Sequence, residues 1–253
     1  MNDKNGDQNQ PDISLEIDQM LEVLREGTVE TEHGVMRWSS NYTFLLSLVH
    51  GDVRTMAVYK PQKGERPLWD FPDGTLCYRE VAAFETSYEL GWAVVPPTVL
   101  RNGPHGLGSI QYFIEHDPEI NYFSFSEEMY PQLRRIAAFD HIVNNADRKG
   151  GHCLVDRNGH LWGIDHGITF NAEHKLRTVI WDFAGQPIPD SMLADMERLC
   201  ARVDDPNSDY RKKLDALLDP REIAAFQRRL QKILQTGRFP QPGRGPNYPW
   251  PPV

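Results

Sequence analysis

The chain of 253 residues is long enough for one domain or for two small lobes that share a cleft. Its formal charge of -9 argues against a broad nucleic-acid surface, and its composition, 40% hydrophobic and 25% charged, is ordinary for a globular protein. The three cysteines lie far apart and outside any CxxC pair, and no apolar run reaches the ~18 residues of a membrane span. We therefore expect a cytoplasmic protein without disulfides or a transmembrane segment, and we expect a monomer.

The N-terminal residues 1–12 are polar and rich in Asn, Asp and Gln, which predicts a disordered tail. Ser14 is placed to cap a helix that runs to about Glu26, where Gly27 ends the apolar pattern. A loosely alternating segment over 28–37 predicts a strand.

Two apolar runs over 44–49 and 55–61 flank the turn at 50–52 and predict a β-hairpin. Lys60 ends the second run, where a lysine exposed to water is the simplest interpretation. The loop before the hairpin is built of small polar residues, Ser39, Ser40 and Asn41.

Helical spacing over 76–90 predicts the next helix, which Gly91 ends. Glu80 lies on it and is either a solvated charge or a partner for Lys60. Two further strands are expected over 94–100 and 109–115.

Residues 136–170 form the most informative stretch of the chain. A helical pattern ends near Asn145, a polar loop carries Asp147, and two short apolar runs predict a hairpin that delivers Asp165 into a second turn. Because a hairpin returns the chain to its starting point, we expect Asp147 and Asp165 to lie close together. Two carboxylates and a His on loops indicate a hard-cation site with a base, as phosphoryl transfer requires.

Three helices are expected over 189–203, 210–218 and 220–234, and the Pro/Gly-rich residues 237–253 predict an extended tail. We expect the body of the chain to divide into an N-terminal lobe over 13–116, a sheet plus a helix, and a mainly helical lobe over 117–236.

The order of these elements, with residues Lys60, Glu80, Asp147 and Asp165 in their places, resembles the protein-kinase-like superfamily. The likeness covers about 39–170 and is strongest to the phosphatidylinositol 3-/4-kinase catalytic domain, in particular its type II 4-kinase branch and a bacterial family grouped with it. The resemblance implies an α+β, two-lobed protein-kinase-like fold, with a small antiparallel β N-lobe and a mainly helical C-lobe.

The resemblance also implies a nucleotide site. The segment Ala57-Val58-Tyr59-Lys60-Pro61 is similar to the strand whose lysine contacts nucleotide phosphates, and Glu80 matches the helix residue that pairs with that lysine. Tyr112, Phe113 and Ile114 stand where the family binds adenine through its hinge backbone. Ser39, Ser40 and Asn41 replace the glycine-rich phosphate loop and are expected to contact the phosphates through hydroxyl and N–H groups.

The catalytic loop is implied by Asn145-Ala146-Asp147-Arg148, with Asp147 as the base or the hydroxyl-orienting carboxylate. Arg148 either holds a phosphate or pairs with a carboxylate. Asp165 matches the magnesium ligand of the family. His152 stands where the family has a second metal ligand, Asn, and an imidazole favours Mn²⁺ or another transition ion over Mg²⁺; it binds metal, donates to a phosphate, or does neither.

The expected function is an ATP-dependent phosphotransferase that uses Mg²⁺ or Mn²⁺ and moves the γ-phosphate to a hydroxyl group. A phosphatidylinositol-type lipid, a protein and a small alcohol remain open as acceptors. The main alternative is a pseudokinase that binds nucleotide as a regulatory module. A metal-dependent phosphohydrolase is a third interpretation, but it leaves Lys60 and Glu80 without a task.

Overall fold

The computed structural model describes residues 13–36 and 41–253. Its helices are α1 (Ile13–Glu26), α2 (Leu76–Leu90), α3 (Tyr130–Val143), α4 (Asp190–Asp204), α5 (Asp209–Leu217) and α6 (Pro220–Thr236). Its strands are β1 (Thr28–Val35), β2 (Phe44–His50), β3 (Val53–Pro61), β4 (Thr98–Gly103), β5 (Gly106–Tyr112), β6 (Cys153–Val155) and β7 (Leu161–Gly163). A 3₁₀ turn, Gly150–His152, precedes β6.

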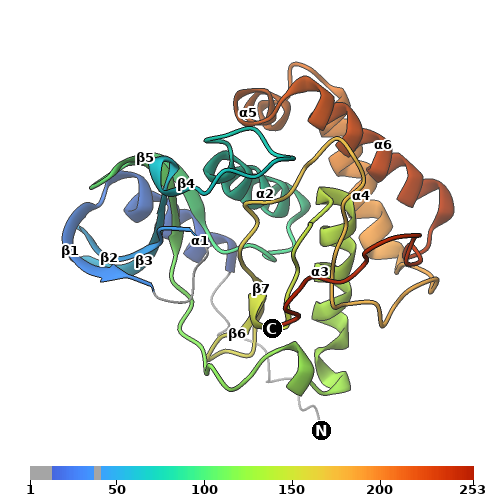
Figure 1. The fold of residues 1–253 in the computed structure, drawn as a ribbon, viewed down its shortest axis with the longest axis horizontal. Helices are drawn as coiled ribbons and strands as arrows, with labels where there is room; N and C mark the ends of the chain where they lie inside the picture. The colour runs from blue at the N-terminus through green and yellow to red at the C-terminus, as the bar shows by residue number, and fades with distance from the viewer. Residues whose placement is uncertain (1–12, 37–40) are drawn as a thin grey trace, which may run out of the picture.

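Five strands form an antiparallel sheet in the order β1-β2-β3-β5-β4. On one face, Leu46, Ala57, Tyr59 and Ile110 are buried in the hydrophobic core, which α1 and α2 also line. Because side chains alternate along a strand, Lys60 projects from the opposite face. The sheet stands to one side of the helices α3 to α6 (Figure 1), so the expected α+β, two-lobed kinase-like fold is confirmed.

Helix α2 occupies the position expected from its sequence and is buried along most of its length. It lies between the sheet and the helices α4 and α5 (Figure 1). Gly91 ends the helix with a left-handed φ of 68°, which a glycine adopts without strain. The central position of α2 fixes the place of Glu80 relative to both parts of the molecule.

The bounds of β4 and β5 differ most from the predicted ones. Strand β4 starts at Thr98 rather than at residue 94, because Pro96 and Pro97 have no N–H group to donate to a neighbouring strand. Strand β5 ends at Tyr112 rather than at residue 115, and the chain then crosses to the helical part. The three C-terminal helices differ from their predicted bounds by one or two residues only.

The tail after α6 turns back across the helical part, and the C-terminus lies beside β6 and β7 (Figure 1). Phe239 is buried, with its ring 5.6 Å from that of Phe183. The carbonyl of Asn247 accepts hydrogen bonds from the Thr178 N–H, 3.1 Å, and the Trp181 indole, 3.1 Å. The tail is therefore packed against the protein, although it forms no regular secondary structure.

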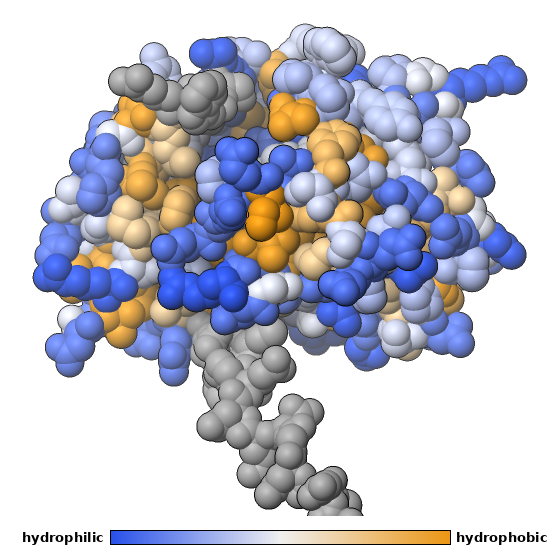
Figure 2. Space-filling view, turned by 90° about the horizontal axis from the view of Figure 1, so that it is seen from below, coloured by the Kyte–Doolittle hydropathy of each residue, from blue (hydrophilic) through white to orange (hydrophobic). Residues whose placement is uncertain are grey.

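The face viewed from below carries hydrophilic side chains around several small apolar groups (Figure 2). Within the described part of the chain, none of the helices combines the length and the apolar character that crossing a bilayer requires.

Candidate active site

The charged residues predicted on β3, on α2 and in the turn after β7 meet at one point. The Lys60 Nζ atom forms ion pairs with Glu80 Oε1 and, at 2.9 Å, with Asp165 Oδ1. The second oxygen of Glu80 accepts the backbone N–H of His166 at 2.9 Å. Glu80 therefore fixes both the lysine and the turn that carries Asp165.

Lys60 and Asp165 stabilise each other's charged forms. Burial alone would lower the pKa of Lys60, but the neighbouring carboxylates of Asp165 and Glu80 outweigh it and hold the pKa above its ordinary value. The Lys60 ammonium in turn holds the pKa of Asp165 well below its usual range. Asp165 also has a φ of 61°, a left-handed conformation that costs a non-glycine residue energy and that the surrounding contacts maintain.

Asp147 lies in the loop that follows α3, with its side chain about one quarter exposed. Its N–H donates to Asn145 Oδ1 at 3.0 Å, and its carboxylate lies 3.4 Å from Lys149 Nζ. Burial raises the pKa of Asp147 to about 6, the Lys149 ammonium opposes the rise, and the negative charge of Asp165 adds to it. A carboxyl group with this pKa accepts a proton more readily than an ordinary Asp.

His152 links the two aspartates. Its Nδ1 lies 3.0 Å from the carbonyl oxygen of Asp147, and its Nε2 lies 3.5 Å from Asp165 Oδ2. Burial lowers the pKa of His152 to about 4, so the ring is neutral near pH 7. The Lys149 N–H also lies 3.5 Å from Nδ1, so backbone groups of the 147–149 loop hold the ring at Nδ1 while Nε2 faces Asp165.

Arg148 points away from the site. Its side chain is fully buried and pairs with Asp140 on α3, at 2.9 Å from Nε and 3.0 Å from Nη2. Its other donors reach the carbonyls of His152 and Ile164 and the ring of His166. No N–H of the guanidinium remains for a phosphate, so of the two predicted possibilities the structure shows the pairing with a carboxylate, and Arg148 positions the loop.

The predicted hinge joins β5 to the helical part. The N–H groups of Tyr112 and Phe113 are bonded to the carbonyls of Pro97 and Met56, at 2.8 and 3.1 Å. Within residues 41–253, no backbone acceptor is found for the Ile114 N–H, whereas the Ile114 side chain packs beneath the hinge against Leu154 and Trp162.

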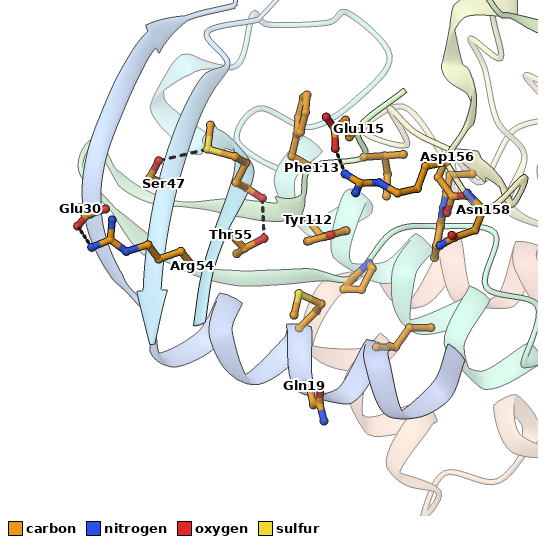
Figure 3. Close-up of a pocket in the computed structure, with 17 residues that line it drawn as sticks. Gln19, Glu30, Ser47, Arg54, Thr55, Tyr112, Phe113, Glu115, Asp156 and Asn158 are labelled. Atoms are coloured by element: carbon orange, nitrogen blue, oxygen red, sulfur yellow. Dashed lines mark hydrogen bonds and ion pairs between the residues drawn. The ribbon is translucent and has the colours of Figure 1, made fainter. Parts of the chain in front are cut away.

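A cavity of about 860 Å³ borders the hinge. Figure 3 shows Tyr112, Phe113 and Glu115 on one side of it and the β6–β7 turn with Asp156 and Asn158 on another. This volume falls in the range of sites for small ligands. Its lining includes neither Lys60 nor Asp165, so the cavity borders the hinge without reaching the charged cluster.

The predicted phosphate loop is only partly described. Ser39 and Ser40 lie outside the described residues. Asn41 is half-buried, and its side-chain oxygen accepts the N–H of Arg66 at 2.9 Å. In this structure Asn41 therefore ties the start of the hairpin to the 62–66 segment.

The described residues contain no preformed group of three or more metal-ligating side chains. The atoms suited to a divalent cation are the carboxylate oxygens of Asp165 and Asp147 and the Nε2 atom of His152. Magnesium is commonly bound through one or two carboxylates together with substrate phosphates rather than by a complete protein cage. The donor set therefore fits an ion that arrives with a polyphosphate.

Sequence reasoning missed two buried residues that organise the site. Asp140 holds Arg148, and its position on the inner face of α3, eight residues before the arginine, was the available signal. Arg79 precedes Glu80 and is as deeply buried, and no pattern in the sequence distinguished it from a solvated arginine.

Residues 98–212 match the family described as phosphatidylinositol 3- and 4-kinase. That range contains the hinge, Asp147, His152 and Asp165, and it extends beyond residue 170, where the predicted resemblance ended. Lys60 and Glu80 precede it.

Two proteins are similar in sequence. Protein Rv2133c of Mycobacterium tuberculosis (strain ATCC 25618 / H37Rv) is 37% identical over 264 residues, which cover 90% of this chain and 94% of the relative. Phosphatidylinositol 4-kinase gamma 3 of Arabidopsis thaliana is 29% identical over 135 residues, which cover 41% of this chain and 24% of the relative. The crystal structure of the Helicobacter pylori proinflammatory kinase CtkA aligns with 85% of this chain and 93% of its own, with a TM-score of 0.48 and 13% identity.

Proposed function

Because the chain belongs to the same family as Rv2133c and carries a phosphatidylinositol 3- and 4-kinase-like domain, we propose that it transfers the γ-phosphate of ATP to a hydroxyl group. The observation that carries this proposal is the meeting of Lys60 with Glu80 and Asp165, with His152 joining Asp165 to the loop of Asp147. A lysine held by two carboxylates supplies positive charge at a fixed point, and such a point suits a polyphosphate.

In this proposal the adenine lies against the hinge, where the Ile114 N–H, which has no backbone acceptor among residues 41–253, would donate to it. The phosphates extend toward Lys60, whose ammonium remains charged near pH 7. Asp165 and His152 would hold Mg²⁺ or Mn²⁺, which when bound neutralises charge on the phosphate oxygens. Glu80 keeps Lys60 in place, and Ser39, Ser40 and Asn41 are proposed to contact the phosphates.

Asp147 orients the acceptor hydroxyl and accepts its proton as the oxygen bonds to the γ-phosphorus, while the bond from that phosphorus to the β–γ bridging oxygen breaks and ADP leaves. Its raised pKa favours this task, and the tie from its N–H to Asn145 holds the loop in position. Arg148 acts through this loop and touches no substrate. Most of the rate enhancement would come from alignment and from electrostatic stabilisation.

For the acceptor we propose an alcohol of the phosphatidylinositol type. The support is the sequence match to the kinase family of that name and the name of the Arabidopsis relative. A protein hydroxyl and a small alcohol are the competing acceptors, which a transfer assay separates directly. Membership of the type II branch stays a prediction.

The test is transfer from γ-labelled ATP to phosphatidylinositol vesicles, a generic protein substrate and inositol, with Mg²⁺ and Mn²⁺ compared. We expect Asp147→Asn to abolish transfer and to leave nucleotide affinity nearly intact. Asp165→Asn should weaken binding of the metal–nucleotide pair itself. Undiminished turnover in Asp147→Asn would reject Asp147 as the base.

The pseudokinase alternative predicts a different result. A protein that binds nucleotide without transferring phosphate would show Lys60-dependent ATP binding and no labelled product with either metal or any acceptor. His152 is the feature that favours this alternative, and His152→Asn is the informative variant because it restores an oxygen ligand for Mg²⁺.

A further inference from the structure

Helix α2 has a second set of contacts besides those with the sheet. Along the helix, Glu85 pairs with Lys213 at 2.6 Å, Thr86 is hydrogen-bonded to Tyr210 at 2.8 Å, and Glu89 pairs with Arg202 at 2.8 Å. The three partners come from α4 and α5. The C-terminal helices thus hold the helix that carries Glu80 on the side away from the sheet.

Arg79 adds a buried ion pair between α2 and α6. Its side chain is 1% exposed, and it donates to Glu222 Oε1 on α6 at 2.6 Å and to the carbonyl of Thr169 at 2.8 Å. The guanidinium also lies 4.9 Å from the ring centre of Phe71. A buried arginine with two acceptors of this kind is held in one conformation.

The contact to Thr169 returns to the candidate active site. The hydroxyl of Thr169 donates to the carbonyl of His166 at 2.7 Å, and the N–H of His166 donates to Glu80. Arg79 and Glu80, adjacent on α2, therefore bind the same turn at two points. These two contacts together fix the position of Glu80 relative to the turn that carries Asp165.

We propose that Arg79 is a positioning residue for the Lys60–Glu80 pair and that Glu222 holds it in place, an inference that rests on the proposed nucleotide site. The C-terminal helices, through this contact, keep α2 in the position in which Glu80 meets Lys60.

The test uses conservative variants, because leaving a buried charge without its partner strongly destabilises a protein. Glu222→Gln keeps a carbonyl acceptor for Arg79 and removes the charge. Arg79→Lys keeps the charge and loses the second donor arm. Arg202→Ala is the matched control, since it removes a half-exposed ion pair to the same helix without touching the turn at 165–169.

Hydrogen–deuterium exchange and the binding of a fluorescent ATP analogue are measured on each variant at a temperature where circular dichroism shows it folded. We expect faster exchange in 76–90 and little change in 130–143 for Glu222→Gln and Arg79→Lys. Their nucleotide affinity should fall about twofold to thirtyfold, the range of coupling through contacts that touch no ligand. Arg202→Ala should leave the affinity at the wild-type value.

The outcomes separate this inference from the function on which it rests. A wild-type chain that binds no nucleotide contradicts the proposed function. The hydrogen–deuterium exchange of α2 in the variants then still tests whether Arg79 and Glu222 hold this helix in place. If nucleotide binding depends on Lys60 and stays at wild-type strength in both Glu222→Gln and Arg79→Lys, the inference about Arg79 is overturned and the proposed function is not. An equal loss of affinity in Arg202→Ala would also overturn it, because general loosening of α2 would then explain the result.

Discussion

Five hydrogen bonds hold the guanidinium of Arg148, and they reach Asp140 on α3, the carbonyls of His152 and Ile164, and the ring of His166. Asp140 opposes burial and raises the pKa of Arg148, so the charge persists inside the protein. Through this one side chain the helix, the loop of Asp147 and the turn of Asp165 share a fixed geometry.

Replacing Arg148 by Met should therefore act on stability first. The change leaves the Asp140 carboxylate buried and unpaired, and we expect a loss of about 3–5 kcal/mol in the free energy of unfolding, measured by urea denaturation. The exposed pair of Arg157 with Glu115 provides the control, since Arg157→Met should cost less than ~1 kcal/mol. Equal losses of unfolding free energy in the two variants would contradict the role of Arg148 as a buried residue that holds the loop of Asp147.

The pKa of Asp147 gives a pH prediction. With the pKa raised to about 6, kcat/KM should increase as pH rises through 6, because the carboxylate must be ionised to accept a proton. Lys60 and Asp165 keep their charges between pH 5 and 8, so these two residues should add no pH dependence of their own to nucleotide affinity. An inflection of the activity near pH 4, the ordinary value, would contradict the assignment.

The same shift has a consequence for stability. The folded state keeps the Asp147 proton up to a higher pH than the unfolded chain, in which the group titrates near 3.8. Between these two values the folded state binds more protons. The contribution of Asp147 to folding therefore becomes less favourable as pH rises from about 4 to 6.

Among the elements, the C-terminal tail shows how an irregular segment supports the candidate active site. Its Pro252 carbonyl accepts the N–H of Gly150 at 2.8 Å, three residues after Asp147. Its Asn247 carbonyl binds Thr178, and residue 178 is bridged to Arg148. The tail thus holds the loop of Asp147 from two directions, whereas Lys60 and Glu80 receive no contact of this kind from it.

Deleting residues 241–253 should accordingly lower kcat more than it lowers nucleotide affinity. Loss of these backbone bonds frees the loop, and a misplaced catalytic group can cost about tenfold to a hundredfold in rate. Trp250→Ala is the control, because that side chain is 89% exposed and its removal leaves the backbone bonds in place. A truncated chain with full kcat would show that the tail is only a covering segment.

At the scale of the molecule, the candidate site is formed jointly by both parts. Lys60 and Glu80 come from the sheet and α2, and Asp147 and Asp165 come from the loops beyond the hinge. A ligand that touches both groups binds the folded state and has no matching site in the unfolded chain. Binding should therefore stabilise the whole protein.

A non-hydrolysable ATP analogue with Mg²⁺ or Mn²⁺, at about 100 times its Kd, should stabilise the chain by ~2.7 kcal/mol. For a chain of this size that corresponds to roughly 5–10 °C in the thermal midpoint, measured by scanning fluorimetry. Asp165→Asn should reduce the shift at the same ligand concentration, and Asp147→Asn should retain it. The absence of a shift with every nucleotide tested would count against the nucleotide site.

The sequence by itself determined the order and kind of the elements and the residues at the loop tips. The period of the apolar residues and the chemistry of turns are local properties, so they revealed α2, the β2–β3 hairpin and the two Asp-bearing loops. The resemblance to phosphatidylinositol 3- and 4-kinases rested on those same residues, and the family match confirms it.

Only the tertiary structure decided which residues Arg148, Arg79 and the last third of the chain contact. Arg79 meets Glu222 across 143 positions of sequence, and Gly150 meets Pro252 across about a hundred. A local pattern cannot distinguish an arginine in water from one that is buried against a distant carboxylate, because the distinction depends on which segments the packing of the core brings together.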